Sequence, residues 1–391
     1  MISVSEALSM LFTLVRVQET EMCPLTLSAG RVLATPIAAK LTQPPFAASS
    51  MDGYAINSIE ADLHAQFVVV GESAAGHRFE GKLGAGQAVR IFTGAPVPEG
   101  ADLVVIQEDV ERRGKLITLL TEKDGNSNIR PAGQDFCTGD IMPAPRVLAP
   151  SDIALAASMN HANLPVFKKP VVAIISTGDE LVQPGESPTP DQIIASNTYG
   201  LKALMEANGA ETRILPIARD NRASLETIFS LADGADLIIT IGGASVGEHD
   251  IVADVAASLG LEQSFYKVAM RPGKPLMAGR MGTSLMVGLP GNPVSAMVCG
   301  HIFLLPVLRA MLGLPKEPAK RLSATLSHSL PSNGPREHYM RASQKDGYIK
   351  AAERQDSALL TILSQSDALL IRPPNDQARA AGEQVEFISI S

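Results

Sequence analysis

Four loops of this chain carry residue types that bind anions, and each directly follows an expected strand. They are residues 176–180, 242–247, 271–275 and 288–293. The glycines of the second loop would let backbone N–H groups approach an anion closely. The third loop supplies two cations, and in the fourth Asn292 and Pro293 suit the start of a helix, whose positive end attracts anions. Because ligands of parallel sheets bind where the strands end, the four loops together predict a bound anionic ligand.

Carboxylates near the same strand ends could hold a metal ion beside such a ligand. Mg²⁺ prefers few carboxylates together with waters and substrate phosphates. The acids would suit that role if they converge beside Lys267, Arg271 and Lys274. For Asp220 and Asp250 a simpler interpretation stays open, since each could cap the helix that follows it. The candidate carboxylates are Glu180, Asp220 and Asp250, with Asp52 and Asp135 earlier in the chain.

Other arrangements that could do chemistry are missing from the sequence. The seven histidines are scattered without metal-ligand spacing, and no serine lies in the motif of a hydrolase nucleophile. The three cysteines lie far apart without a CxxC pair, which excludes a disulfide framework and gives no zinc or iron–sulfur spacing. The chemistry is therefore expected from the anion-binding loops and the carboxylates.

Charge and composition restrict the class of protein. A net charge of −8 without any basic block argues against bulk binding of nucleic acid. Hydrophobic residues make up 45% and charged residues 19%, which is typical of a globular protein. Residues 1–17 do not form a signal peptide, and the proline break at residues 290–293 is expected to leave the apolar stretch 285–308 too short to span a bilayer. A cytoplasmic protein is expected, with neither a membrane nor a nucleic acid as partner.

Hydrophobic periodicity divides the 391 residues into segments of different character. Short strands punctuated by Gly and Pro predict a β-rich module between residues 46 and 138. Between residues 170 and 312, strands alternate with helices, which predicts a doubly wound, mostly parallel sheet within a multidomain α/β protein. Strand-like pieces beyond residue 316 predict a C-terminal β domain. In the central block the expected strands are 171–176, 213–217, 236–241, 266–270 and 284–289, and the expected helices are 197–208, 222–231, 250–259 and 293–312.

A set of ordered motifs runs through most of the chain. PPFAASSMDGYA at residues 44–55 is followed by RIFTGAP at 90–96 and NIRPAGQD at 128–135. Together the motifs resemble the molybdopterin molybdenumtransferase family, which includes the bacterial MoeA proteins and the E domain of gephyrin. The resemblance is strong through residue 312 and weaker beyond it. It continues through residues 176–181, 196–197, 240–250, 270–275 and 288–295.

The resemblance implies an elongated homodimer in which each chain has four domains. The α/β domain would be of the molybdopterin-binding type. In this family the active cleft is shared between the α/β domain of one subunit and the inserted β-rich domain of the other, so that Asp52 and Asp250 could serve one site. The implied domains are residues 1–45 with 139–168 (elongated and discontinuous), 46–138 (inserted), 169–315 (α/β) and 316–391 (C-terminal β).

The resemblance also carries over site residues. For Arg271 some members of the family have Lys, which keeps a cation but changes its geometry. The catalytic positions that match are Asp52, Thr93, Arg130, Asp135, Glu180, Asp220, Asp250, Lys267, Arg271 and Lys274. The substrate-binding positions that match are Gly242, Gly243, Ser245, Gly247, Pro290, Gly291, Asn292 and Ser295, with Arg336 and Ser357 in the less regular part of the molybdate site.

The reaction implied by the resemblance inserts molybdate into adenylylated molybdopterin and releases AMP. Lys274, Arg271 and Arg336 would attract the molybdate dianion. Mg²⁺ held by Asp220 and Asp250 would neutralise the pyrophosphate, and the other acids would position these parts or handle protons. The expected partners are a second copy of the chain, anionic small-molecule substrates, the adenylyltransferase and the molybdoenzymes.

Three other functions stay open at this level. A molybdopterin adenylyltransferase shares the α/β domain, but it would consume ATP and would not need residues 1–150. A non-catalytic dimeric scaffold, a role that the gephyrin E domain also has, would not need converging acids and cations. A paralogue that acts on tungstate or a related oxyanion is the third, because oxyanion size discriminates poorly.

Overall fold

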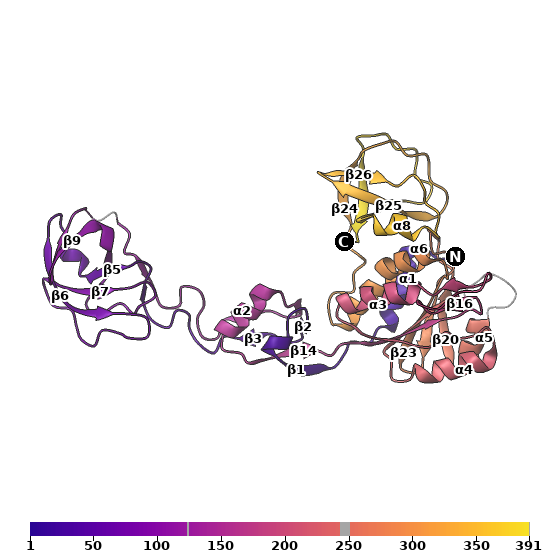
Figure 1. Cartoon of the computed structure of the whole chain (residues 1–391), viewed down its shortest axis with the longest axis horizontal. Helices are drawn as coiled ribbons and strands as arrows, with labels where there is room; N and C mark the ends of the chain where they lie inside the picture. The colour runs from indigo at the N-terminus through magenta and orange to yellow at the C-terminus, as the bar shows by residue number, and fades with distance from the viewer. Residues whose placement is uncertain (123–124, 243–250, 391) are drawn as a thin grey trace.

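The computed structural model describes residues 1–122, 125–242 and 251–390. Figure 1 shows an elongated molecule, with a small β domain at one end, a slender middle part, and two larger domains packed together at the other end. The chain begins in the larger body, runs out to the small β domain, and returns to build the α/β and C-terminal domains. The domain boundaries expected from the sequence remain a proposal.

The slender middle part joins two distant segments of the chain in one sheet. β1 (Thr20–Pro24) pairs antiparallel with β14 (Asn163–Phe167), which also pairs with β2 (Val32–Leu33). α2 (Pro150–Ser158) begins with a proline, which suits the first turn of a helix because that turn needs no N–H bond. Apolar side chains from both segments form a small core. The remaining strands are β3 (Ile37–Ala38), β12 (Ile141–Met142) and β13 (Arg146–Val147).

The small β domain at the far end contains six strands in the order β8-β5-β7-β6-β10-β9. Side chains alternate between core and solvent, as in β10, where Ile117 is buried and Leu116 is exposed. In β5, Gly53 lies so close to the carbonyl of Val105 that no side chain would fit. The strands are β5 (Gly53–Ile56), β6 (Gln66–Ser73), β7 (Gln87–Ile91), β8 (Leu103–Ile106), β9 (Val110–Arg113) and β10 (Leu116–Leu119), beside the pair β4 (Ala48–Ser49) and β11 (Ile129–Arg130).

The α/β domain contains a six-stranded sheet whose first four strands run parallel, in the order β18-β15-β19-β23. The last three of these are nearly continuous runs of buried apolar residues, as expected for parallel strands covered on both faces. The sheet continues through β22, which is antiparallel to both neighbours, to β20 at the edge. The strands are β15 (Val171–Ser176), β18 (Glu211–Ile214), β19 (Leu237–Ile241), β20 (Leu261–Tyr266), β22 (Met277–Met281) and β23 (Ser284–Leu289).

Helices cover both faces of this sheet, which confirms the doubly wound α/β fold. α1, α3 and α6 pack on one face, and α4 and α5 pack on the other. Because β18 and β19 lie on opposite sides of β15, the strand order reverses there, and ligands of such sheets bind at the reversal. The helices are α1 (Val4–Leu14), α3 (Asn197–Ala207), α4 (Arg222–Leu231), α5 (Ile251–Ser258) and α6 (Pro293–Cys299).

The strand expected at residues 266–270 is wrong. β20 ends before Lys267, and β21 (Met270–Arg271) pairs in parallel with a strand of the C-terminal domain. Lys267 has a φ of +80°, which interrupts the extended backbone between the two strands. The loop of residues 271–275 therefore follows a strand of the C-terminal sheet, and not one of the central sheet as expected.

One apolar helix of the described residues has the length to cross a membrane. It runs over Pro293–Met311, 19 residues with a mean hydropathy of 1.7, so the expectation that the proline break leaves too short a remainder is wrong. However, 78% of its most apolar window is buried inside the protein, so the helix serves as a core helix. It consists of α6, a π-helical turn at Gly300–Leu304, and α7 (Leu305–Met311).

The C-terminal domain closes its sheet into a ring. Five strands follow the order β25-β26-β24-β28-β27, and β27 pairs back onto β25, which removes the exposed edges that an open sheet would have. β21 adds residues of the neighbouring α/β domain to this sheet, so backbone hydrogen bonds join the two domains. The elements are β24 (Leu322–Leu326), β25 (Glu337–Lys345), β26 (Tyr348–Ala351), α8 (Leu360–Ser364), β27 (Ala368–Arg372) and β28 (Gln384–Ser389).

Candidate active site

A cavity of about 920 Å³ opens where the parallel strands of the α/β domain end. Its walls include the ends of β15, β19 and β23 and the start of α3, at the reversal of strand order where a ligand is expected. The structure thus brings together six of the residues expected from the sequence. They are Glu180, Asp220, Gly242, Pro290, Gly291 and Asn292.

Two glycines in the wall of this cavity, Gly242 and Gly291, lie with their backbones close together. Gly242 has a φ of +92°, and a Cβ atom there would lie 2.8 Å from the carbonyl oxygen of Thr177. A Cβ atom on Gly291 would lie 3.6 Å from the Cα atom of Gly242. The side-chain amide of Asn197 fixes the second loop by donating to the Gly291 carbonyl at 2.7 Å. Position 242 therefore requires glycine, whereas a Cβ atom at position 291 would make an ordinary van der Waals contact.

The start of α6 differs in two ways from the helix end expected for anion binding. Asn292 occupies the N-cap position, but its side chain makes no capping hydrogen bond, which leaves the amide available to a ligand. The N–H of Val294 donates to the carbonyl oxygen of Ser357 at 3.1 Å, so this N–H is already used. Ser357 thus contributes a backbone carbonyl here, and Ser295 is buried in the first turn of the helix.

Three carboxylates lie near one another at one side of the cavity. The backbone N–H of Asp220 donates to Asp179 Oδ1 at 3.3 Å, and the guanidinium of Arg219 donates to the Asp179 carbonyl at 3.0 Å. Burial raises the pKa of the Asp220 carboxyl, and the negative charges of Asp179 and Glu180 raise it further. A cation bound at this point would relieve the mutual repulsion of the acids.

This acidic wall fits an open Mg²⁺ site. Within residues 1–122, 125–242 and 251–390, no three His, Cys, Asp or Glu side chains converge closely enough to hold a metal on their own. Mg²⁺ does not require such a cage, because it binds through one or two carboxylates together with waters and substrate phosphates. The donor chemistry of Asp220 and its neighbours fits that mode, and the second expected ligand, Asp250, lies outside the described residues.

Four cations lie on the segments that join the α/β and C-terminal domains. Lys267, Arg271 and Lys274 belong to the chain between β20 and β22, and Arg336 precedes β25. One guanidinium nitrogen of Arg336 lies 3.4 Å from the carbonyl oxygen of Met270, which places it beside β21. In the part of the chain that the structure describes, none of the four forms an ion pair with a carboxylate. Their charge is therefore available to an anionic ligand.

His338 lies in the positive field of this region. Its pKa is lowered to about 4, first because the imidazole is buried and then because of the charges of Arg271, Arg341, Arg372 and Arg336. Several positive charges that disfavour a protonated imidazole would favour a dianion in the same place. The junction of the two domains therefore has the electrostatics of an oxyanion site.

The residues expected from the first part of the chain belong to other parts of the molecule than this cavity. Asp52 precedes β5 and Thr93 follows β7, and Figure 1 shows these strands at the opposite end of the molecule from the α/β domain. The carboxylate of Asp52 accepts hydrogen bonds from the Thr93 N–H and from the Thr93 hydroxyl, both at 2.7 Å. These bonds hold the Asp52 pKa below its ordinary value. Arg130, in β11, and Asp135, on the returning segment, are both exposed. A single chain therefore does not bring these four residues to the cavity.

The chain is similar to known proteins over nearly its whole length. Family models match at residues 2–160 (MoeA N-terminal region, domain I and II), 173–310 (probable molybdopterin binding domain) and 323–390 (MoeA C-terminal region, domain IV). The molybdopterin molybdenumtransferase of Nostoc sp. is 36% identical, in a match that covers 99% of this chain and 94% of that protein. Molybdopterin molybdenumtransferase 2 of Mycobacterium tuberculosis is 34% identical over 93% of each chain. The chain belongs to the molybdopterin molybdenumtransferase family.

A solved structure agrees with this membership of the molybdopterin molybdenumtransferase family. The molybdopterin biosynthesis moeA protein from Pyrococcus horikoshii superposes with a TM-score of 0.87 at 26% identity, and the match covers 100% of both chains. The family and the fold class indicated by the motifs are therefore confirmed. The matched models also include the regions before residue 160 and after residue 323, which lie outside the α/β domain.

Four of the expected site residues lie outside the described part of the chain. They are Gly243, Ser245, Gly247 and Asp250. Conversely, Ser176, Thr177 and Asn197 line the cavity. The sequence indicated the loop at 176–180 and the motif at 196–197, but it did not select these three side chains as site residues. The first two directly end or follow a predicted strand, which is a usable signal. For Asn197 no local signal exists, because its contact with Gly291 crosses 94 positions.

Arg341 is a further residue that the sequence does not single out. Its side chain is almost fully buried and donates to Gln355 Oε1 at 3.0 Å and to the Asp356 carbonyl at 2.6 Å. The segment with Gln355 and Asp356 continues into Ser357, whose carbonyl oxygen accepts a hydrogen bond from the Val294 N–H. Arg341 therefore fixes the segment through which the C-terminal domain reaches the start of α6.

Proposed function

We propose that this chain transfers molybdenum from molybdate to adenylylated molybdopterin and releases AMP, as the names of its relatives indicate. The observation that carries the proposal is the cavity at the strand ends, with acids on one wall and unpaired cations on the adjoining domain junction. Such a site offers cations that attract a dianion, and carboxylates that could hold Mg²⁺ against a phosphate ligand. The family membership supports molybdate and molybdopterin as the substrates.

The proposed roles follow from the charges around the cavity. Arg271, Lys274 and Arg336 attract and orient molybdate, because their cationic groups have no competing carboxylate among the described residues. Asn292 and the loops at Gly242 and Gly291 bind the polar parts of the pterin and its phosphate. Lys267 extends the cationic side of the site.

Mg²⁺ is the cofactor that we propose, held by Asp220 and Asp250 with Glu180 nearby. When bound, it would act as a Lewis acid that neutralises charge on the pyrophosphate as AMP departs. The pKa of Asp220 is raised first by burial and then by the charges of Asp179 and Glu180, and this local excess of negative charge supports the assignment. Glu180 would orient water around the same group.

We further propose a homodimer whose cleft combines two subunits. The support is the position of the small β domain, which Figure 1 shows at the opposite end of the molecule from the α/β domain. Asp52 precedes β5 and Thr93 follows β7 of that domain, so they have no site of this kind within their own chain. The same holds for Arg130 in β11 and for Asp135 on the returning segment. An ionised Asp52, held by Thr93, would then face the cavity of the other subunit. The four-domain division, the cytoplasmic location, and the adenylyltransferase and molybdoenzymes as protein partners belong to the same proposal.

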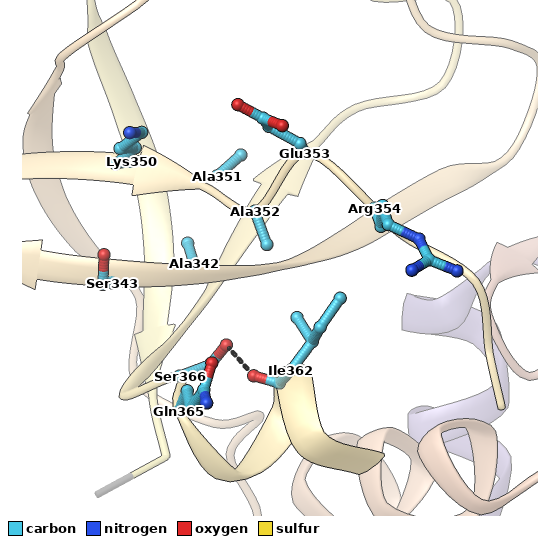
Figure 2. A pocket seen from close by; sticks show the side chains of 10 residues that line it. All are labelled: Ala342, Ser343, Lys350, Ala351, Ala352, Glu353, Arg354, Ile362, Gln365 and Ser366. Carbon is cyan, nitrogen blue, oxygen red and sulfur yellow. Dashed lines mark hydrogen bonds between the residues drawn. The ribbon is translucent and has the colours of Figure 1, made fainter. Parts of the chain in front are cut away.

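A purified-component assay tests this function. Adenylylated molybdopterin, Mg²⁺ and molybdate are incubated with the protein, and AMP release is measured together with reconstitution of an apo-molybdoenzyme. Lys274→Ala should lower the rate about 10- to 100-fold, because a bond to a charged group contributes ~1.5–3 kcal/mol. Lys350→Ala is the matched control, since this exposed lysine lines a separate cavity of the C-terminal domain (Figure 2).

The alternatives give different results in the same assay. Consumption of ATP with molybdopterin alone would indicate an adenylyltransferase. Tight binding of the adenylylated pterin without AMP release would indicate a scaffold, and a rate that depends on tungstate but not on molybdate would indicate another oxyanion. Equal activity of Lys274→Ala and Lys350→Ala would contradict the proposed molybdate site.

A further inference from the structure

A second cavity, of about 470 Å³, lies against the substrate cavity. Ser196 and Asn197 line both cavities, so they form a common wall between them. The second cavity lies where α3 and α6 of the α/β domain meet α8 of the C-terminal domain. Its sides are mainly apolar and include Met297, Leu360 and Leu363.

The lining of the second cavity differs in charge from that of the first. None of the described residues that line it is Asp, Glu, Lys or Arg, whereas Glu180 and Asp220 line the substrate cavity. Gly200 adds no side chain, and a Cβ atom there would come within 2.9 Å of the Met297 sulfur. The cavity therefore suits an uncharged group that contacts apolar side chains and also forms hydrogen bonds, because Ser364 and Ser366 are among its lining residues.

His301 gives this cavity a polar group without an internal partner. It lies in the π-helical turn at Gly300–Leu304, a backbone form that often occurs at functional sites. Burial lowers its pKa to about 4, so its ring is neutral at physiological pH. Among the described residues no partner accepts from or donates to the ring nitrogens, so one donor and one acceptor remain available to a ligand.

We propose that this second cavity binds the adenine ring of the adenylylated substrate, which rests on the proposed function above. That substrate contains two flat heterocycles joined by a charged pyrophosphate. The pyrophosphate needs the charged cavity, and the two cavities adjoin at Asn197, so one heterocycle can enter the uncharged neighbour. Adenine carries no charge and presents ring nitrogens and an amino group, which match the free donor and acceptor of His301 and the amide of Asn197.

Binding of AMP to the full-length protein tests the adenine site, with ribose 5-phosphate as a probe that lacks the base. In Leu363→Phe the larger side chain fills the cavity, and in His301→Phe the ring loses its polar atoms. Each variant should bind AMP about tenfold more weakly by calorimetry, the size expected for losing one buried contact or hydrogen bond. Binding of ribose 5-phosphate should stay as in the unmodified protein.

Ile362→Phe is the matched control on the same short helix. Ile362 points away from the adenine site into the cavity between α8 and β26, beside Ala352 and Arg354 (Figure 2). This variant should bind AMP normally, and melting temperatures of all variants show whether they are folded. His301→Phe keeps the test valid if Leu363→Phe does not fold.

Two results would overturn the adenine site. One is unchanged AMP affinity in both Leu363→Phe and His301→Phe, and the other is weakened binding of 6-hydroxymethylpterin with normal AMP binding, which would assign the cavity to the pterin. Molybdate-dependent AMP release by the unmodified protein separates these failures from failure of the proposed function. If that release is present while the variants bind AMP normally, only the adenine site is refuted.

Discussion

Replacement of Gly242 by alanine should disturb the substrate cavity, because of the backbone conformation there and one close neighbour. Gly242 has a φ of +92°, and an added Cβ atom would lie 2.8 Å from the carbonyl oxygen and 3.0 Å from the hydroxyl oxygen of Thr177. Gly234 offers a matched control in the same domain. Its φ is +74°, and an added Cβ atom would meet nothing within 4 Å.

The difference in unfolding free energy between the two variants follows from these contacts. Each alanine costs about 1–2 kcal/mol for a left-handed backbone and regains about 0.4–1 kcal/mol through a less flexible unfolded chain. Only Gly242→Ala must also displace Thr177, and overpacking of this kind costs about 1–3 kcal/mol. The net loss should be about 1 kcal/mol for Gly234→Ala and about 2–4 kcal/mol for Gly242→Ala.

Calorimetric melting and steady-state AMP release measure the two consequences. Gly242→Ala should melt about 2–10 °C below Gly234→Ala, since 1 kcal/mol corresponds to about 2–4 °C in a domain of this size. Displacement of Thr177 should also lower kcat/KM about tenfold, whereas Gly234→Ala should keep the normal value. Equal melting temperatures together with normal kcat/KM in both variants would refute the claim that position 242 requires glycine beside Thr177.

Three further variants test other parts of the site and fold. Arg336→Gln should raise the molybdate concentration needed for half-maximal rate about tenfold, because it removes one unpaired positive charge beside Met270. AMP binding should stay unchanged. If the molybdate dependence does not change, Arg336 does not belong to the site. Thr93→Val removes a hydrogen bond that lowers the Asp52 pKa, so the acidic limb of the pH–rate profile should move to higher pH. If the acidic limb stays at the wild-type pH, Asp52 does not act as an ionised group. The pKa of Asp376 is lowered by its hydrogen bond to Arg379 and by Arg372, so its stabilising effect is present above about pH 4 and lost as pH falls through its folded pKa. Asp376→Asn should therefore lower the melting temperature at pH 7. Its melting temperature should also fall less on acidification than that of the wild type, and an equal fall in both proteins would contradict this.

Buried strands followed by turns could be predicted from the sequence to the residue. β15 and β23 coincide with the predicted segments 171–176 and 284–289, because parallel strands covered on both faces are continuous apolar runs. α4 begins at the predicted Arg222, where the side chain of Asn221 accepts the N–H of Ser224 and caps the helix.

β20, at the edge of the sheet, and its neighbour β22 could not be predicted in the same way. β20 contains Glu262 and Gln263, and its ladder with β22 shifts register at Gln263, so no clear alternation marks it. β22 contains Gly279, which has the backbone of a neighbouring strand close by and reads as a loop residue in the sequence. Because β20 and β22 were not predicted, a strand was expected at residues 266–270 instead.

The location of the site follows from topology, whereas its contacts do not. Loops at the carboxyl ends of parallel strands must meet, so the cavity lies where the sequence predicts a ligand. The contact of Asp52 with Thr93 crosses 41 positions within another domain, and only the family resemblance indicated either residue. The second cavity and the π-helical turn beside it depend on how two domains pack, which no local pattern encodes.

A complementation assay with mixed dimers tests the shared cleft most directly. Asp52→Ala and Lys274→Ala are purified separately, and the low residual activity of each is measured. They are then mixed under conditions that exchange subunits, with molybdate-dependent AMP release above this residual level as the readout. In a two-fold dimer with a shared cleft, half of the sites in each mixed dimer regain both residues, so about a quarter of the wild-type activity should return. No recovery, with subunit exchange verified by mass spectrometry, would contradict the shared cleft and place Asp52 and Lys274 in functions that do not meet.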